Sequence, residues 1–559
     1  MRLVFARVGA DSGRLASQGR TSKRHQSIFP LGNSSICGKA VGMFLGLDSS
    51  TQSITAVLID PAKGEIVNQL SVNFGSDFPQ YLSPSGFIPG GINGEVHANP
   101  MMWLEALDLL MSRLAALMDL SQVKAISGSG QQHGSVYLDA SFDERIAKLD
   151  PYHSLVSQIS PAFSRATCPI WMDTSTGCEC AEITAALGGP EEICERSGSI
   201  AIERFSGPQI RRFYKSDPSG YARTARIHLV SSFVASILAG KSVPIDFGDG
   251  AGMNLLNLSR QTWDTDLLAA TAPDLACRLL PPALTTTVQG ALSGYFVDKY
   301  GFSAECQTTL FTGDNPASLV GMGATTPGNI VISLGTSDTF FAAMAGPKTD
   351  PKGYGHVFGN PAGGYMSLIC FRNGSLAREA LRDSLGVDWA AFEREALATT
   401  LCHAGKNLML PFYGAEVTPR HDFTGPVLKG SCEFESGSDP GLQVRALLEG
   451  QFLNMRLHSE WMEVKSERIR LTGGASKNDG IAQLVANIFQ APVERLDVSN
   501  SAALGAALIA AAASGHDLPA LQDVFCKATA GSALEPDAGL AATYQEALGE
   551  FESLLAAAL

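Results

Sequence analysis

Short apolar runs alternate with longer helical patterns from Phe44 onward, and this alternation limits the fold more than any other feature of the sequence. Residues 44–47 and 53–59 have the pattern of two strands around a polar turn, which predicts a β-hairpin, and residues 101–118 have the apolar spacing of a helix. Mixed order of this kind over 559 residues is typical of two α/β domains. We place the boundary in the region 285–300, which gives domains of 43–290 and 291–559.

Further predicted elements continue the alternation. Strands are expected at 123–127, 308–312, 329–334 and 468–472, and helical sequence at 222–238 and 502–513. The chain beyond about residue 512 is rich in Ala, Leu and Glu, and we expect a terminal helix there that packs on the second domain. No apolar run approaches the ~18 to 20 residues of a membrane span, so no transmembrane segment is predicted.

Charge is distributed unevenly along the chain. The formal net charge is −14, but residues 1–42 hold seven basic residues and one acid, so the rest of the chain carries −20. An acidic body argues against nucleic-acid or anionic-membrane partners. The basic, Ser-rich first 42 residues have the composition of an organelle transit peptide. The alternatives are a mis-assigned start, with Met43 as the true first residue, and a disordered basic arm.

The eleven cysteines are odd in number and scattered, and only Cys178 and Cys180 form a close pair. A single CxC without a second pair is not zinc-like spacing. We therefore predict free thiols, most of them packed in the interior, in a reducing compartment. Cytoplasmic localisation is expected, with organellar import if residues 1–42 are a real transit peptide.

Two polar turns follow apolar strands, one at residues 48–52 and the other at 335–339. Turns rich in Gly, Ser and Thr expose backbone N–H groups and hydroxyls that hold phosphate oxygens. Asp48 adds a carboxylate ligand for Mg²⁺. One turn lies near the start of each domain, as a duplicated domain would place them. Ordinary hairpin turns are the alternative.

A third turn contains the paired glycines Gly473 and Gly474, between a strand and a helical pattern. The glycines would let a nucleotide approach the backbone at the start of a helix. Neither G-x-x-x-x-G-K-[ST] nor G-x-G-x-x-G after the first strand is present. The three turns therefore predict a nucleotide-binding architecture other than a P-loop or a Rossmann fold.

Two side chains are candidates for chemistry on the acceptor substrate. Asp314 would lie at a strand end, where it could accept the proton of a substrate hydroxyl that attacks a phosphate; a helix cap is the alternative role. His133 lies in a Gly-rich polar loop and is a candidate ligand of a substrate hydroxyl. Its alternative is a loop histidine without a role.

Together these segments resemble the FGGY carbohydrate kinase family of the actin-like ATPase superfamily. The similarity extends from about residue 43 to about residue 512. It is carried by LDSSTQS (47–53), SGSGQQHGS (127–135), CPIWMD (168–173), ERFSG (203–207), PIDFGDGAGMNLL (244–256), TGDNPASL (312–319), SLGTSDT (333–339) and TGGAS (472–476).

The resemblance implies two ribonuclease-H-like α/β domains facing across a catalytic cleft, the first binding sugar and the second binding ATP. It implies ATP-dependent phosphorylation of D-xylulose to D-xylulose 5-phosphate, with ATP and Mg²⁺ as cofactors. The partners would be small molecules, and an assembly of two copies is left open. The alternatives are a kinase for another ketose or polyol, and a non-catalytic actin-like sugar sensor or scaffold.

The resemblance also assigns roles to single residues. Asp314 would be the catalytic base, and the sugar ligands would be His133, Arg204, Asp314 and Asn315. Asp48 would bind Mg²⁺. The nucleotide ligands would be Ser50, Thr51, Gly335, Thr336, Trp389, Gly473, Gly474 and Asn478. Because the resemblance places the base at Asp314, we interpret the rival carboxylates Asp246 and Asp249 as structural residues or as residues that support the site without touching the substrate.

Overall fold

The computed structural model describes residues 42–398, 407–496 and 500–559. The predicted basic extension therefore lies outside the described residues, apart from Gly42, and its nature stays a prediction. None of the helices in these ranges is long and apolar enough to cross a membrane. All cysteines in these ranges are free thiols, and most of them are buried.

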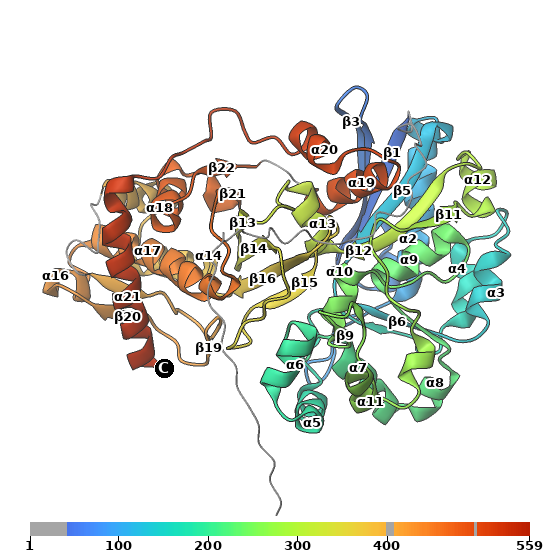
Figure 1. The fold of residues 1–559 in the computed structure, drawn as a ribbon, viewed down its shortest axis with the longest axis horizontal. Helices are drawn as coiled ribbons and strands as arrows, with labels where there is room; N and C mark the ends of the chain where they lie inside the picture. Colours follow the sequence, from blue (N-terminus) through green and yellow to red (C-terminus); the bar gives the residue numbers. More distant parts are fainter. Residues whose placement is uncertain (1–41, 399–406, 497–499) are drawn as a thin grey trace, which may run out of the picture. The chain divides into compact units, whose positions relative to one another are not determined.

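The first sheet has six strands in the order β11-β12-β5-β1-β2-β3 (Figure 1). They are β1 (Met43–Ser49), β2 (Ser53–Asp60), β3 (Glu65–Asn73), β5 (Val123–Gly130), β11 (Val288–Ala291) and β12 (Gln307–Gly313). Strands β1 and β2 form the predicted antiparallel hairpin, whereas β1, β5 and β12 run parallel to one another. The carboxyl ends of these three parallel strands therefore lie at one edge of the sheet.

Helices cover both faces of the first sheet, which explains why β1 and β2 are near-continuous apolar runs with buried residues on both sides. One face packs on α2 (Pro100–Leu117) and α9 (Val230–Ala239). The opposite face packs on α19 (Ser501–Ala513), which lies against α13 (Asp314–Gly321). A helix from near the end of the chain thus covers this face of the first sheet.

The second sheet also has six strands, in the order β15-β16-β14-β13-β21-β22 (Figure 1). They are β13 (Asn329–Leu334), β14 (Asp338–Met344), β15 (His356–Gly359), β16 (Tyr365–Phe371), β21 (Arg468–Gly473) and β22 (Val493–Arg495). From β22 to β16 this sheet repeats the order and strand directions of β12 to β3 in the first sheet. The repeat suggested by the two polar turns is therefore present as a shared topology.

The main helices that follow the start of the second sheet pack around α17. They are α14 (Ser375–Leu385), α15 (Trp389–Ala398), α17 (Pro440–Ser459), α18 (Asp479–Phe489) and α21 (Ala541–Ala558). The segment after residue 512 differs from the single helix that we expected. Helix α20 (Leu518–Phe525) packs on α19, and only α21 packs on α17 and α18. The expected packing on the second domain therefore holds for the last helix alone.

The helix predicted over 222–238 is interrupted in the structure. Helix α8 (Pro218–Arg223) ends before it, and β8 (Arg226–Leu229) precedes α9. Strand β8 pairs antiparallel with β6 (Ser135–Leu138). A partner strand about ninety residues earlier in the chain decides the conformation here, because pairing outweighs a weak local helical preference.

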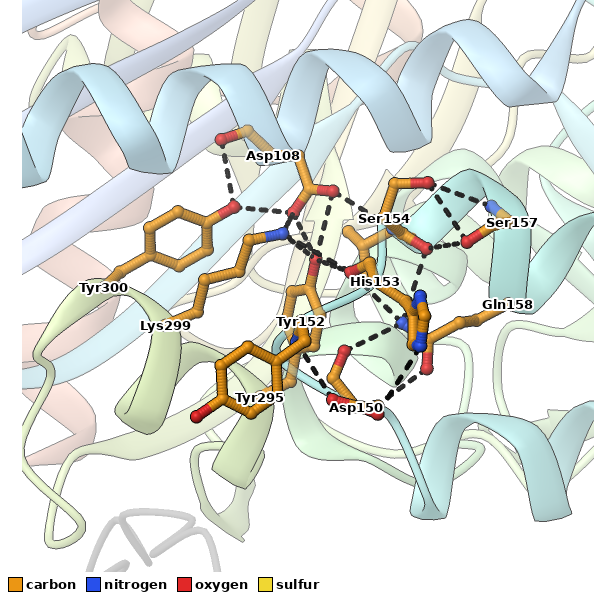
Figure 2. A network of polar contacts seen from close by, with 11 residues as sticks. Asp108, Asp150, Tyr152, His153, Ser154, Ser157, Gln158, Tyr295, Lys299 and Tyr300 are labelled. Carbon is orange, nitrogen blue, oxygen red and sulfur yellow. Dashed lines mark hydrogen bonds and ion pairs between the residues drawn. The ribbon is translucent and has the colours of Figure 1, made fainter.

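Helix α12 (Gly294–Tyr300) is tied to α2 by a polar network around Asp108 (Figure 2). The hydroxyls of Tyr295 and Tyr300 donate to the Asp108 carboxylate at 2.7 and 2.6 Å, and Lys299 forms an ion pair with it at 3.4 Å. The backbone N–H of Leu155 donates to the other carboxylate oxygen at 3.0 Å. The network therefore holds α12, which leads into β12, against the core helix of the first sheet.

The chain passes from the first sheet to the second between β12 and β13, because β11 and β12 both belong to the first sheet. In addition, α19 returns from the second half of the sequence to the first sheet. The predicted division into 43–290 and 291–559 stays a prediction about the domains.

Candidate active site

The register of the first sheet brings three predicted site segments together. Asp48 on β1 pairs with Ser129 on β5, and Gly313 on β12 pairs with Gly130 on β5. Because the strands are parallel, the segments that follow them leave the sheet at the same edge, where ligands of α/β folds bind. This edge carries Asp48, the loop through His133, and Asp314.

The Asp48 side chain is 8% exposed and is held by hydroxyl donors. Ser129 Oγ donates to Oδ1 at 2.8 Å, and Ser50 Oγ donates to Oδ2. Burial raises the pKa of Asp48 in spite of these donors. Asp48, Ser50 and Asp314 line a cavity of about 360 Å³ that also includes Asn500 and Ser501 at the start of α19.

The possible metal ligands around this cavity suit Mg²⁺ better than a transition metal. They are carboxylate, hydroxyl and amide oxygens, which a hard cation prefers. The described residues contain no group of three or more His, Cys, Asp or Glu side chains placed to hold a metal ion. A cation here would therefore need phosphate or water oxygens in addition to Asp48.

Asp314 begins α13 directly after β12, so the strand end and the helix start place its carboxylate at the sheet edge. Its Oδ1 accepts from the backbone N–H of Asn315 at 2.9 Å and from Asn315 Nδ2 at 3.1 Å. Asn315 Nδ2 also donates to Gln132 Oε1 at 2.7 Å. Burial, together with the negative charge of Asp48, raises the pKa of Asp314 to about 7. The carboxyl is thus poised to exchange a proton near neutral pH.

Asp246 and Asp249 are buried next to this site but are engaged in local structure. Asp246 caps α10 (Phe247–Gly250) by accepting from two backbone N–H groups, and Thr285 Oγ1 donates to it at 2.6 Å. Asp249 accepts from Ser231 Oγ at 2.5 Å. Burial raises the pKa of Asp246 to about 6, and burial with the charge of Asp246 raises the pKa of Asp249 well above its ordinary value.

His133 is 7% exposed and has a left-handed backbone, φ 69°, which is uncommon for a residue other than glycine. Its Nδ1 lies 2.9 Å from the carbonyl oxygen of Gly252. A carbonyl only accepts, so Nδ1 carries the proton and Nε2 keeps its lone pair. Burial, with the nearby charge of Arg204, lowers the pKa of His133 to about 3. The ring is therefore a neutral acceptor at physiological pH.

Arg204 and His133 both lie against the ring of Phe205. The guanidinium carbon is 5.5 Å from the Phe205 ring centre, and the His133 and Phe205 rings are 4.5 Å apart. No ion pair among the described residues includes Arg204. The predicted sugar ligands Asp314, Asn315, His133 and Arg204 are thus connected through Gln132 and Phe205.

The second sheet brings the other predicted turns together. Leu334 on β13 pairs with Gly473 on the parallel β21. The turns that begin at Gly335 and Gly474 therefore leave the sheet at the same edge. Gly473 has φ 91°, and a Cβ there would lie 2.3 Å from the Leu334 carbonyl oxygen. Only glycine fits this close approach. Thr336 is exposed, and a Cβ at Gly474 would meet no atom within 4 Å.

Asn478 and Trp389 have additional roles in the structure. Asn478 caps α18, and its side chain accepts from the backbone N–H of Ile481 at 3.1 Å. Trp389 begins α15, is 40% exposed, and has the guanidinium of Arg382 4.5 Å from its ring centre. None of the hydrogen bonds or ring contacts in the described ranges joins Trp389 to the glycine turn.

Two residues at the site were not assigned a role from the sequence. The indole N–H of Trp171, a residue 45% exposed, donates to Thr51 Oγ1 at 2.8 Å. Gln132 bridges toward Asn315, as described above. Both lie in segments that carried the family resemblance, but only the folded chain shows which site residues they touch.

Both halves of the chain match one protein family. Residues 166–321 match the N-terminal domain, and residues 330–514 the C-terminal domain, of the FGGY family of carbohydrate kinases. The chain is 41% identical over 471 residues to a xylulose kinase of Rattus norvegicus, covering 83% of this chain and 87% of that protein. It is 42% identical over 491 residues to xylulose kinase 2 of Arabidopsis thaliana, covering 84% and 87%.

Solved structures share the fold. A xylulose kinase from Rhodospirillum rubrum superposes with a TM-score of 0.77 at 21% identity, covering 92% of this chain and 98% of that one. A glycerol kinase of Plasmodium falciparum gives 0.73 at 17% identity, with the same coverage. The expected fold class, two ribonuclease-H-like domains of the actin-like ATPase type, is confirmed. The chain belongs to the FGGY family of carbohydrate kinases.

Proposed function

We propose that this kinase transfers the γ-phosphoryl group of ATP to D-xylulose and forms D-xylulose 5-phosphate. The substrate is suggested by the curated relatives that bear the name xylulose kinase. The single observation that carries the chemistry is the common sheet edge at which Asp48, His133 and Asp314 meet. Residues 43–290 would supply most of the sugar site and residues 291–559 most of the ATP site.

On the sugar side, Asp314 acts as the general base. Its carboxylate accepts the proton of the C5 hydroxyl as that oxygen forms its bond to the γ-phosphorus, and the bond to the β–γ bridging oxygen breaks to release ADP. The free Nε2 of His133 accepts a hydrogen bond from another sugar hydroxyl. Arg204 and Asn315 hold further sugar oxygens, so that the reacting hydroxyl points at the phosphate.

On the nucleotide side, the polar turns hold phosphate oxygens through backbone N–H groups and hydroxyls. Ser50 and Thr51 belong to the first turn, and Gly335 and Thr336 to the second. Gly473, Gly474 and Asn478 would contact the adenosine, with Trp389 against the base. Mg²⁺, when bound through Asp48, supplies positive charge that offsets the negative charge of the phosphates.

A substrate panel tests the function directly. We expect Mg²⁺-dependent ADP release with D-xylulose. The sugar site contains an ionisable base (Asp314), a neutral hydrogen-bond acceptor (His133) and a guanidinium donor (Arg204), which together suit the hydroxyl groups of a sugar. The measurement compares kcat/KM for D-xylulose, other ketopentoses and glycerol. Turnover of glycerol without turnover of xylulose would assign the chain to a different acceptor. Sugar or ATP binding without any turnover would instead support the sensor or scaffold alternative.

The pH dependence tests the assignment of the base. Asp314 must be ionised to accept a proton, and burial beside Asp48 raises its pKa to about 7. We therefore expect kcat/KM to be level in mild alkali and to fall by about tenfold per pH unit well below pH 7. The residual activity of Asp314→Asn should lack this acidic limb. An identical limb in both proteins would show that another group titrates.

A further inference from the structure

Arg204, the arginine that we propose as a sugar ligand, is held by a histidine from the second sheet. His356 is the first residue of β15, which pairs with β16 in the second sheet, whereas Arg204 precedes α7 (Ser206–Ser216) in the first half of the chain. Arg204 Nη2 lies 3.1 Å from His356 Nε2. His356 is 4% exposed, so this contact is in the interior of the protein.

Simple hydrogen-bond rules fix the state of the His356 ring. A guanidinium can only donate, so Nε2 of His356 must accept and cannot carry a proton. The proton is therefore on Nδ1, which lies 3.1 Å from Ser199 Oγ and donates to it. Burial, with the charge of Arg204, holds the pKa of His356 well below its ordinary range. The ring is neutral and has one fixed tautomer.

The surroundings hold His356 rigidly. The backbone N–H of Val357 donates to the Gly198 carbonyl at 3.0 Å, so β15 is joined to the segment that carries Ser199. Asn254 Nδ2 donates to the Ser199 carbonyl at 3.0 Å. The Phe205 ring lies 5.4 Å from the His356 ring in an edge-on contact. The acceptor atom for Arg204 is therefore fixed on several sides.

We propose that His356 is a positioning residue for the sugar site, which orients the Arg204 guanidinium through Nε2 and makes the site depend on a residue of the second sheet. This inference rests on the proposed role of Arg204 as a sugar ligand. A neutral imidazole takes one of the five guanidinium N–H donors and leaves the others for the hydroxyls of a neutral sugar. A carboxylate at this position would take two donors in a bidentate pair.

Two substitutions of His356 separate positioning from packing. His356→Leu removes the acceptor and leaves a guanidinium N–H without a partner, so we expect KM for the sugar to rise at least about tenfold, which corresponds to ~1.4 kcal/mol. KM for ATP should change by less than twofold. His356→Gln restores an acceptor oxygen toward Arg204 and should return the sugar KM to within about threefold of the wild-type value.

The control is a buried histidine of the same half of the chain. His458 on α17 is 5% exposed and donates through Nδ1 to the Asn454 carbonyl at 3.0 Å. His458→Leu should lower the thermal midpoint without changing the sugar KM. The double variant Arg204→Met/His356→Leu should have the same sugar KM as Arg204→Met alone, because the histidine then has nothing to orient.

Several results would overturn the proposal. They are an unchanged sugar KM in His356→Leu, an equal rise in the KM for sugar and ATP, failure of His356→Gln to recover, and additive effects in the double variant. The proposed function fails separately, if the wild-type protein does not use D-xylulose. The variants are then compared on whichever sugar the wild type phosphorylates, or by calorimetric binding of that sugar if turnover is absent.

Discussion

Asp314→Asn is expected to lower kcat for xylulose phosphorylation by ~10²- to 10⁴-fold, the usual contribution of a positioned general base. The amide keeps the volume of the side chain and its contacts with Asn315, but it cannot take up the hydroxyl proton. The loss should appear in kcat and leave KM for ATP nearly unchanged. Steady-state kinetics with saturating Mg²⁺ and both substrates varied provide the measurement.

Asp249→Asn is the matched control for this experiment. Burial and the charge of Asp246 raise the pKa of Asp249 well above its ordinary value, which favours the protonated form of its carboxyl. An amide resembles the protonated form, so turnover should stay within a few-fold of the wild-type value. If Asp249→Asn lost activity and Asp314→Asn kept it, the base would have to be reassigned to Asp249.

Stability separates lost chemistry from lost folding in Asp314→Asn. Folding raises the pKa of Asp314, so ionisation of this carboxyl destabilises the folded state as the pH rises above the ordinary carboxyl pKa. The full loss of stability is reached above about pH 7. Asp314→Asn should therefore have a thermal midpoint at pH 8 that is at least as high as that of the wild type. Its advantage should shrink toward pH 4. A lower midpoint at pH 8 would indicate structural damage.

Gly505→Ala is expected to destabilise the protein by ~3 kcal/mol or more, at the upper end of the usual cost of overpacking. A Cβ at Gly505 on α19 would lie 1.9 Å from the Ala317 carbonyl oxygen and 2.9 Å from the Gly321 backbone nitrogen on α13. Both neighbours are backbone atoms and cannot rotate away. The two helices would have to separate, and because α13 begins at Asp314, activity should fall as well.

Gly549→Ala is the control for the same chemical change. Gly549 lies in α21, and a Cβ there meets no atom within 4 Å. Alanine in an open helical position should raise stability by ~0.5–1 kcal/mol, because glycine loses more backbone entropy on folding. Urea unfolding midpoints and thermal melts of both variants provide the comparison. Equal effects of the two substitutions would show that α13 and α19 are not in close backbone contact.

Local patterns predicted the parts of the fold that depend on short segments. The hairpin of β1 and β2, helix α2, and the strands β5, β12, β13 and β21 follow from runs of a few apolar residues and the turns beside them. Strand β8 was missed because its partner, β6, lies far away in the sequence. The position of α19 on the first sheet was missed for the same reason.

The candidate site divides in a similar way. The polar turns, the paired glycines and Asp314 stand out in the sequence because residue type and neighbouring strands mark them. The proximity of Gln132 to Asn315, of Trp171 to Thr51 and of His356 to Arg204 does not, since each pair is joined only by folding. Burial likewise decides that His133 is neutral and that Asp314 titrates near pH 7.

The sequence by itself determined the mixed α/β architecture, the three phosphate-compatible turns and the residue types available for catalysis. Those features depend on local patterning and side-chain chemistry. Only the tertiary structure decided that α19 closes the first sheet, that Asp246 and Asp249 have structural partners, and that a neutral histidine of the second sheet holds Arg204. These features depend on strand register and on desolvation, which arise when distant segments pack together.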